Sequence, residues 1–226
     1  MTYYAKSKPK ETIMEHTKIL LENLKVLKNI YSKDIERNKD FVNERFWYLL
    51  EIICKYHDIG KVYTPFQNII RQKLGEKIIE TEFSYETVKH EQLSPMFVPV
   101  EKLGLTEDEK VLVYQAIYYH HERENKEISK EYIRRIIEKD VYPNIDKIKQ
   151  ELKIDIREKI DERYVKYIGD RITEHHHLYK KIYPEYCMLK GLLHRLDHSS
   201  STEIAVENEN GQVIEECTEE FMEDHD

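Results

Sequence analysis

Five short stretches of the sequence carry histidine and aspartate side chains of the kind that bind metal ions. The residues are His16, His57, Asp58, His90, His120, His121 and Asp197. At least four of them fall on apolar stripes of the helices expected around them, so these side chains should point inward. Burying imidazoles and carboxylates without partners costs several kcal/mol for each group. A shared metal site would satisfy them together, although each stretch alone has a plainer interpretation as a buried histidine or a helix-end pair.

The mixture of donor atoms indicates which ions would fit. Imidazole and carboxylate without thiolate suit divalent Mn, Fe, Co, Ni or Zn, and suit Mg less well. Seven ligands are more than one ion needs, so the sequence predicts two ions bridged by a carboxylate, with Asp58 as the bridge. Two ions about 3.5–4 Å apart activate a water molecule and clamp the oxygens of a phosphoryl group. The three cysteines are too scattered for a thiolate zinc site or a disulfide framework.

Amphipathic helices are expected to position these ligands. The predicted helices cover residues 12–30, 43–58, 106–124 and 184–198. In the first helix, His16 shares a face with Leu20 and Leu24, so it lies on the buried stripe. In the second helix, His57 shares a face with apolar residues, and Asp197 does so in the last helix. The pattern therefore brings ligands from several helices toward one interior.

The segments between these helices are harder to interpret. Residues 61–84 look like short helical or irregular structure with a break at Gly75. Residues 126–172 are highly charged, and they are expected to be helical with a break near Pro143. We interpret them as an excursion on the surface. The run Ser199–Ser201 is expected to end the last helix.

The bulk composition indicates one domain of the all-α class with an acidic tail. The chain has 226 residues, 40% of them hydrophobic, and only six glycines and six prolines. The net charge of −8 comes from residues 203–226, which contain ten acidic residues and no Lys or Arg. Residues 1–202 thus have 34 acidic and 36 basic residues, close to neutrality. Residues 203–226 are predicted to be a tail or linker, with a short hairpin turning at Asn210-Gly211.

The sequence shows no targeting or membrane signal. Its first residues, MTYYAKSKPKETIMEH, lack the apolar core of a signal peptide. No run approaches the roughly 18 apolar residues that a membrane span needs. A cytoplasmic location without membrane contact is therefore expected.

Three local motifs resemble those of a known family. The stretch HDIGKVYTPFQ, the stretch KHEQLSP and the stretch LLHRLDHSSS occur in this order, with His16 upstream and the pair His120-His121 between the last two. This arrangement resembles the HD phosphohydrolase superfamily. More narrowly, it is similar to the CRISPR-associated HD nuclease, the nuclease part of the type I CRISPR nuclease-helicase. The resemblance covers roughly residues 10–202.

The resemblance implies a fold, a ligand set and an activity. The fold would be an all-α HD-domain bundle with a dinuclear metal site in its core. His16, His57, Asp58 and Asp197 would hold the first ion, and Asp58, His90, His120 and His121 the second. Asp58 and Lys61 would act in catalysis, Lys61 by steadying phosphate charge. The family hydrolyses phosphodiester bonds of single-stranded DNA, and in some members of RNA, by a metal-bound hydroxide. A helicase partner would supply the strand within the CRISPR interference complex.

The sequence also departs from the family pattern. Glu122 and Arg123 follow the histidine pair, where many members have glycine. This feature, together with HDIGK, resembles the cyclic-dinucleotide phosphodiesterases of the same superfamily, but their Gly-Tyr-Pro element is missing. No phosphate-binding loop of a helicase is present. The chain is therefore expected to be a free-standing nuclease subunit or the front piece of a longer protein.

Two other functions and three minor features stay open at this stage. The chain could be a phosphodiesterase or nucleotidase for a nucleotide or cyclic dinucleotide, or a metal-stabilised interaction subunit without catalysis. Tyr118 and Tyr119 are interpreted as packing residues, with base stacking as the alternative. His175–His177 are interpreted as polar surface, with an extra metal site as the alternative. Ser94 could support the fold or contact the ligands.

Overall fold

The computed structural model shows a mostly helical protein, which agrees with the class expected from the sequence. It describes residues 2–37, 42–84, 88–121, 129–160, 162–173, 175–202 and 205–207. The expectation of a purely helical fold is wrong in one respect, because the chain begins with an antiparallel hairpin of β1 (Tyr4–Ser7) and β2 (Lys10–Thr12). Tyr4 and Ala5 are buried, so the hairpin belongs to the packed body. No helix in the described ranges is long and apolar enough to cross a bilayer.

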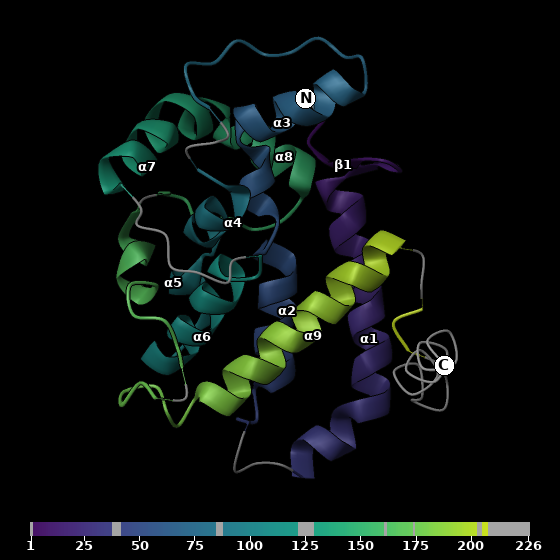
Figure 1. Ribbon diagram of the computed structural model, residues 1–226, viewed down its shortest axis with the longest axis vertical. Coiled ribbons are helices and arrows are strands. Elements are labelled where there is room, and N and C mark those ends of the chain that lie inside the picture. Colours follow the sequence, from purple (N-terminus) through teal and green to yellow (C-terminus); the bar gives the residue numbers. More distant parts are fainter. Residues whose placement is uncertain are drawn as a thin grey trace, which may run out of the picture.

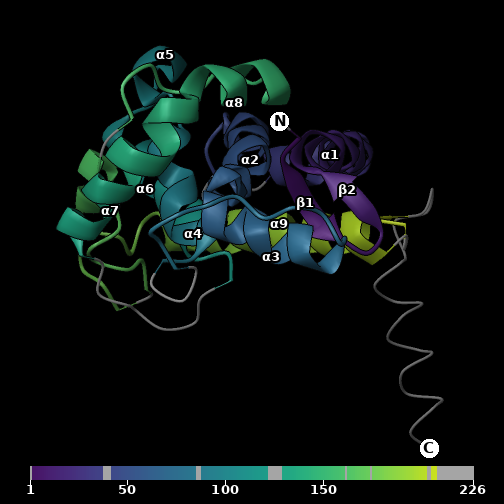
Figure 2. The same ribbon diagram turned by 90° about the horizontal axis from the view of Figure 1, so that it is seen from above.

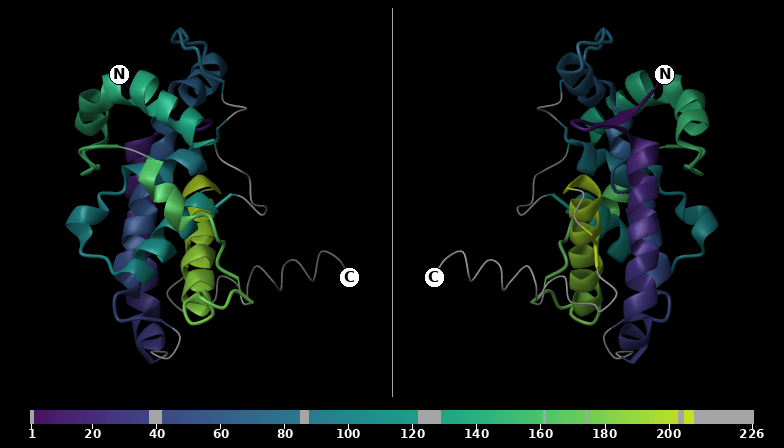
Figure 3. Two further views of the ribbon diagram at one scale, coloured as in Figure 1. Left: turned by 90° about the vertical axis from the view of Figure 1, so that its left-hand side faces the viewer. Right: turned by 90° about the vertical axis from the view of Figure 1, so that its right-hand side faces the viewer.

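Four helices form the centre of the fold. They are α1 (Ile13–Arg37), α2 (Phe46–Tyr56), α6 (Glu107–Tyr118) and α9 (Tyr183–Thr202). Helix α2 contacts the other three, and Leu49, Leu50 and Ile53 on it are fully buried. It lies behind α9 in Figure 1, whereas Figure 3 shows α1 and α9 side by side along their lengths. Burial of apolar side chains from four helices on one another is the main stabilising term of this bundle.

Helix ends decide where the histidine pair lies. Thr106 caps α6, because its hydroxyl accepts a hydrogen bond from the Glu109 amide and the Glu109 carboxylate accepts one from the Thr106 amide. The cap predicted at Thr106 is therefore confirmed. The helix ends at Tyr118, several residues before the expected end, so His120 and His121 follow it in a turn.

Short elements connect α2 to α6. They are the 3₁₀ turns η1 (Ile59–Val62) and η2 (Ser94–Phe97), with the helices α3 (Thr64–Lys73), α4 (His90–Leu93) and α5 (Val100–Leu103). This agrees with the short helical structure expected after residue 61. Turn η1 contacts both α3 and α4, so the segment after α2 is enclosed by its neighbours in sequence.

The charged region after residue 129 is not an excursion on the surface. It forms α7 (Lys130–Ile136), a π-helical turn (Ile137–Val141), the 3₁₀ turn η4 (Tyr142–Asn144), α8 (Ile145–Leu152) and the 3₁₀ turn η5 (Glu162–Tyr167). Its apolar side chains enter the core: Ile133, Ile136, Ile137, Val141, Ile148, Leu152, Ile156, Ile160 and Tyr164 are all buried. Figure 2 shows α7 and α8 lying against the side of the bundle formed by α6 and α2. The prediction failed because the many charges concealed a regular stripe of isoleucines.

The serine run does not end the last helix, as expected, but continues it to Thr202. The Ser200 hydroxyl donates to the Asp197 carbonyl at 2.8 Å, and the Thr202 hydroxyl donates to the His198 carbonyl at 2.8 Å. Hydroxyls that bond back to the preceding turn are compatible with a helix. Beyond the helix, Val206 and Glu207 are buried, so this part of the predicted tail belongs to the body. The hairpin expected at Asn210-Gly211 lies outside the described residues.

Candidate metal centre

The structure brings all seven predicted ligands together around the carboxylate of Asp58. Asp58 lies in the turn between α2 and η1, and its side chain is 3% exposed. It belongs to two groups of four residues whose ligand atoms lie within 4.8 Å of one another. The groups are Asp58, His90, His120 and His121, and His16, His57, Asp58 and Asp197. These are the two ligand sets expected from the sequence, and they share one carboxylate.

The first group joins α1, α9 and the end of α2. His16 Nε2 lies 3.0 Å from Asp197 Oδ1 and 3.6 Å from Asp58 Oδ2. His57 Nε2 lies 3.6 Å from the same Asp58 oxygen and 3.8 Å from Asp197 Oδ1. Two imidazole nitrogens therefore face two carboxylate oxygens across a gap of the width that a divalent ion bridges.

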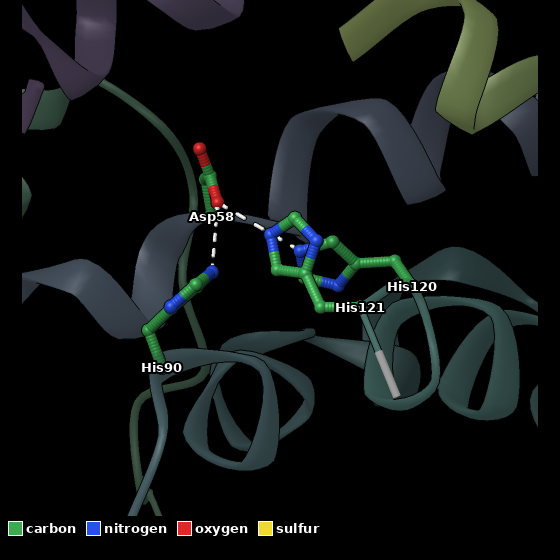
Figure 4. Close-up of side chains that lie close together, drawn as sticks. All are labelled: Asp58, His90, His120 and His121. Atoms are coloured by element: carbon green, nitrogen blue, oxygen red, sulfur yellow. Dashed lines mark ion pairs between the residues drawn. The ribbon is translucent and has the colours of Figure 1, made fainter. Parts of the chain in front are cut away.

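The second group uses the other oxygen of Asp58. His90 Nε2 lies 3.3 Å from Asp58 Oδ1, and His120 Nε2 lies 3.9 Å from it. Figure 4 shows His90 approaching this carboxylate from one side and His120 with His121 from the other. The His120 and His121 ring centroids are 4.0 Å apart, and His121 is the exposed member of the group. The centre is therefore enclosed except at His121 and at Asp197, whose side chain is 22% exposed.

The histidine tautomers are set by bonds on the far side of each ring. His57 Nδ1 lies 3.0 Å from the Cys54 carbonyl, and His120 Nδ1 lies 2.6 Å from the Ile117 carbonyl. A carbonyl only accepts, so each Nδ1 carries the proton and each Nε2 presents a lone pair. Within the described residues, neither Nε2 has a hydrogen-bond partner, nor has Asp58 Oδ1. Buried polar atoms normally have partners, so these atoms fit a bound cation.

Two glutamates that the sequence analysis did not single out lie behind the other histidines. His16 Nδ1 is 3.5 Å from Glu11 Oε2, and His90 Nδ1 is 3.2 Å from Glu91 Oε2. Both glutamates are buried. Carboxylates behind metal-binding histidines orient the ring and raise its basicity. Glu91 stands beside His90 in the KHEQLSP motif, which gives a signal in sequence, whereas Glu11 comes from β2 and gives none.

The charges in the centre are arranged around Asp58. Burial raises the pKa of this carboxyl, but the neighbouring Lys61 and His57 lower it more, and the net pKa lies well below the usual range. Burial lowers the pKa of His57, whereas Asp58 and Asp197 raise it to a net increase. Burial lowers the pKa of His90 to about 4, and it also lowers that of His120. The carboxylates are therefore ionised and His90 and His120 neutral near pH 7, which is the form that binds a metal.

Lys61 lies beside the centre, as expected from its place in the motif. Its Nζ is 2.6 Å from Asp58 Oδ2, and its side chain is 14% exposed. The ammonium balances the carboxylate charge, and it stands close enough to the cluster to reach an anionic group bound there.

Gly60 and Ser94 link the two halves of the centre. The Gly60 amide donates to Ser94 Oγ at 2.9 Å, and this hydroxyl donates to the His90 carbonyl at 3.0 Å. A β-carbon on Gly60 would overlap the His90 carbonyl and lie 2.8 Å from the Ser94 nitrogen. Glycine is therefore needed here for close approach, and Ser94 holds His90 in place without being a ligand.

The alternatives for the minor features are resolved in part. Tyr118 and Tyr119 are each 2% exposed, so they pack in the core and offer no face for stacking. His176 stacks on His177 and on Tyr179, and among the described residues none of these belongs to either candidate metal group. Cys54 is buried, as expected for a core residue.

Comparisons with known proteins give no match. No protein-family model matches the chain, and neither the curated proteins nor the solved structures contain a significant match. What the protein does must therefore be argued from the chemistry of the centre itself.

Proposed function

We propose that the protein is a two-metal phosphodiesterase that cleaves single-stranded nucleic acid, with DNA preferred. The observation that carries this proposal is the division of Asp58, with Oδ1 facing His90 and His120 and Oδ2 facing His57 and His16. A carboxylate with separate imidazole groups on its two oxygens suits a bridge between two ions. Divalent transition ions such as Mn, Ni, Co, Fe or Zn suit this donor set, Mg less so.

Each side chain of the centre has a task in this chemistry. Two bound ions would activate water and neutralise charge on the phosphoryl oxygens. His57 and His120 present fixed Nε2 lone pairs, because their Nδ1 protons are held by backbone carbonyls. Burial of the cluster excludes bulk water and strengthens electrostatic interactions inside it. Lys61 moves its ammonium from Asp58 to a non-bridging phosphate oxygen and so stabilises the developing negative charge.

The exposed edge of the centre supports a polymer as the substrate. His121 is exposed and Asp197 is partly exposed, so a phosphodiester could approach from the surface while the other five ligands stay buried. The resemblance to the CRISPR-associated HD nuclease adds a role in CRISPR interference, with a helicase partner feeding the displaced strand. Binding along a strand would weaken with salt, because counterions return to the phosphates.

The test uses metal-stripped protein and a labelled circular single-stranded DNA, with Mn, Ni, Co, Zn or Mg added singly. Cleavage that needs an added transition ion is the expected result, together with two bound ions per chain by elemental analysis. Asp58→Asn should abolish cleavage and lower the bound metal. Asp34→Asn, which makes the same charge change on a carboxylate with a 64% exposed side chain, is the matched control. Two bound ions without cleavage of any DNA, RNA or cyclic dinucleotide would refute the enzymatic role and leave a metal-stabilised interaction subunit.

A further inference from the structure

A partly exposed phenylalanine lies beside the metal centre. Phe66 is in the first turn of α3, and its ring centroid lies 5.4 Å from that of His90. The Lys61 ammonium lies 5.6 Å from the centre of the same ring. Phe66 therefore contacts both a candidate ligand of the second group and the cation that pairs with Asp58.

This exposure is unusual for the chain. The other described phenylalanines, Phe46, Phe83 and Phe97, are all buried, and Tyr118 and Tyr119 next to the histidine pair are buried too. Phe66 is instead of intermediate exposure. An apolar ring next to a cluster of charged and polar groups leaves part of its surface available to a ligand with a flat apolar face.

The backbone that carries Phe66 is held firmly on both sides. The Thr64 amide donates to Asp140 Oδ2 at 2.9 Å, and Pro65 follows in the first turn of α3. The Gln67 amide group donates to the Lys61 carbonyl at 2.7 Å and to the Tyr4 carbonyl at 2.9 Å. Gln67 is fully buried, so α3, the first strand and the turn after Asp58 are joined at this point. A residue on such a fixed turn can position a ligand with little loss of conformational freedom.

We propose that Phe66 stacks on the nucleobase next to the scissile phosphate. The proposal rests on the function proposed above, and it adds which part of the substrate is recognised. Stacking uses the π-face that every base has, so it gives affinity without sequence preference. Bases in a duplex are already stacked on their neighbours, so a single strand is the form that can offer one. Lys61, between Asp58 and the ring, would contact the phosphate attached to that nucleotide.

The test compares an ordinary single-stranded oligonucleotide with one in which tetrahydrofuran spacers replace the bases. Phe66→Leu keeps an apolar side chain against His90 and removes the π-face, whereas Phe66→Trp restores one. The wild type should bind and cleave the base-bearing strand about 10-fold better than the abasic strand, given the usual strength of base–aromatic stacking. Phe66→Leu should remove most of this preference, mainly through KM, and Phe66→Trp should retain it. Tyr142→Leu, which alters a 39% exposed aromatic of η4, should leave the preference unchanged.

Binding is measured separately from cleavage by fluorescence anisotropy of both strands, on the metal-loaded and the metal-stripped protein. A preference for bases that Phe66→Leu leaves intact would overturn the proposal, whether or not the strands are cut. An equal loss on both strands would also overturn it, because it would show that the ring only supports the centre. If the wild type prefers bases and loses that preference in Phe66→Leu but cleaves nothing, the stacking role stands and the proposed hydrolysis fails.

Discussion

The hydroxyl of Ser94 accepts a hydrogen bond from the Gly60 amide at 2.9 Å and donates one to the His90 carbonyl at 3.0 Å. Ser94 thereby joins the turn that carries Asp58 to the helix that carries His90, and both ends of the link are buried. The separation of His90 from Asp58 thus depends on a contact that no side chain of the centre makes. Residues 60 and 94 should therefore affect metal binding without being ligands.

Gly60→Ala tests the closeness of this approach. The added β-carbon would meet the His90 carbonyl and the Ser94 nitrogen, so α4 must move away from Asp58. We expect the free energy of unfolding to fall by at least about 1–3 kcal/mol, the usual cost of overpacking, and the bound metal to fall with it. Chemical denaturation and elemental analysis measure the two effects. Gly191→Ala in α9 is the control, because no atom lies within 4 Å of its added β-carbon, and it should not lower stability. Equal metal content in both variants would contradict the prediction.

Ser94→Ala tests the link itself. It leaves the Gly60 amide without its acceptor and the His90 carbonyl without this donor, in a site with no room for bulk water. A buried group left without a partner costs about 1–3 kcal/mol, which should appear in urea denaturation of the metal-free protein. The affinity for Mn or Ni should fall as well, as measured by calorimetry. Ser32→Ala removes a hydroxyl that donates to the Lys28 carbonyl on the exposed side of α1, and it should change neither quantity.

The ligands could be found from the sequence, because their order and helical spacing are local properties of the chain. His16 and Asp197 lie on apolar stripes that the 3.6-residue period makes visible, and both stripes face the interior. Glu11 and Ser94 could not be found in this way. Their roles come from contacts between segments distant in sequence, and a lone glutamate or serine carries no periodic signal. The N-terminal hairpin was missed for the same reason, since Gln67, 63 residues after Tyr4, holds it in place.

The region after residue 129 shows a different limit. Its charge indicated a surface segment, yet Ile133, Ile136 and Ile148 are at most 1% exposed. A helix with a charged outer face and a narrow apolar stripe still buries that stripe, because only one side of it meets solvent. Overall charge therefore could not decide between an excursion and a layer of the core.

The folded part of the chain should extend beyond residue 202. Arg195 on α9 donates to the Val206 carbonyl at 2.9 Å and pairs with Glu207 at 2.6 Å, and the Tyr31 hydroxyl of α1 also bonds to Glu207. The Glu207 side chain is fully buried, so this contact connects the helices that carry His16 and Asp197. Removing one partner of a buried ion pair typically costs about 3–5 kcal/mol. A chain ending at residue 202 should therefore melt at a lower temperature than one ending at residue 207, and Glu207→Ala should act like the shorter chain. Equal melting temperatures for the two lengths would show that residues 205–207 add nothing to the fold.

The stability of the protein should fall as the pH rises toward neutrality because of Glu185 in the first turn of α9. Burial raises the pKa of this carboxyl from 4.5 to about 7, against the opposing hydrogen bond from the Asn43 amide, and the nearby Glu109, which pairs with Arg45, raises it further. Between these two values the folded state holds a proton that the unfolded state has lost, so the free energy of unfolding decreases with pH across this window and levels off above it. The contribution is of the order of 3 kcal/mol. Glu185→Gln keeps the acceptor and removes the titration, so its stability relative to the wild type should increase from pH 4.5 to pH 8 in denaturation curves. The exposed Glu138→Gln makes the same charge change and should run parallel to the wild type, and a parallel course for Glu185→Gln would show that this carboxyl does not hold the proton.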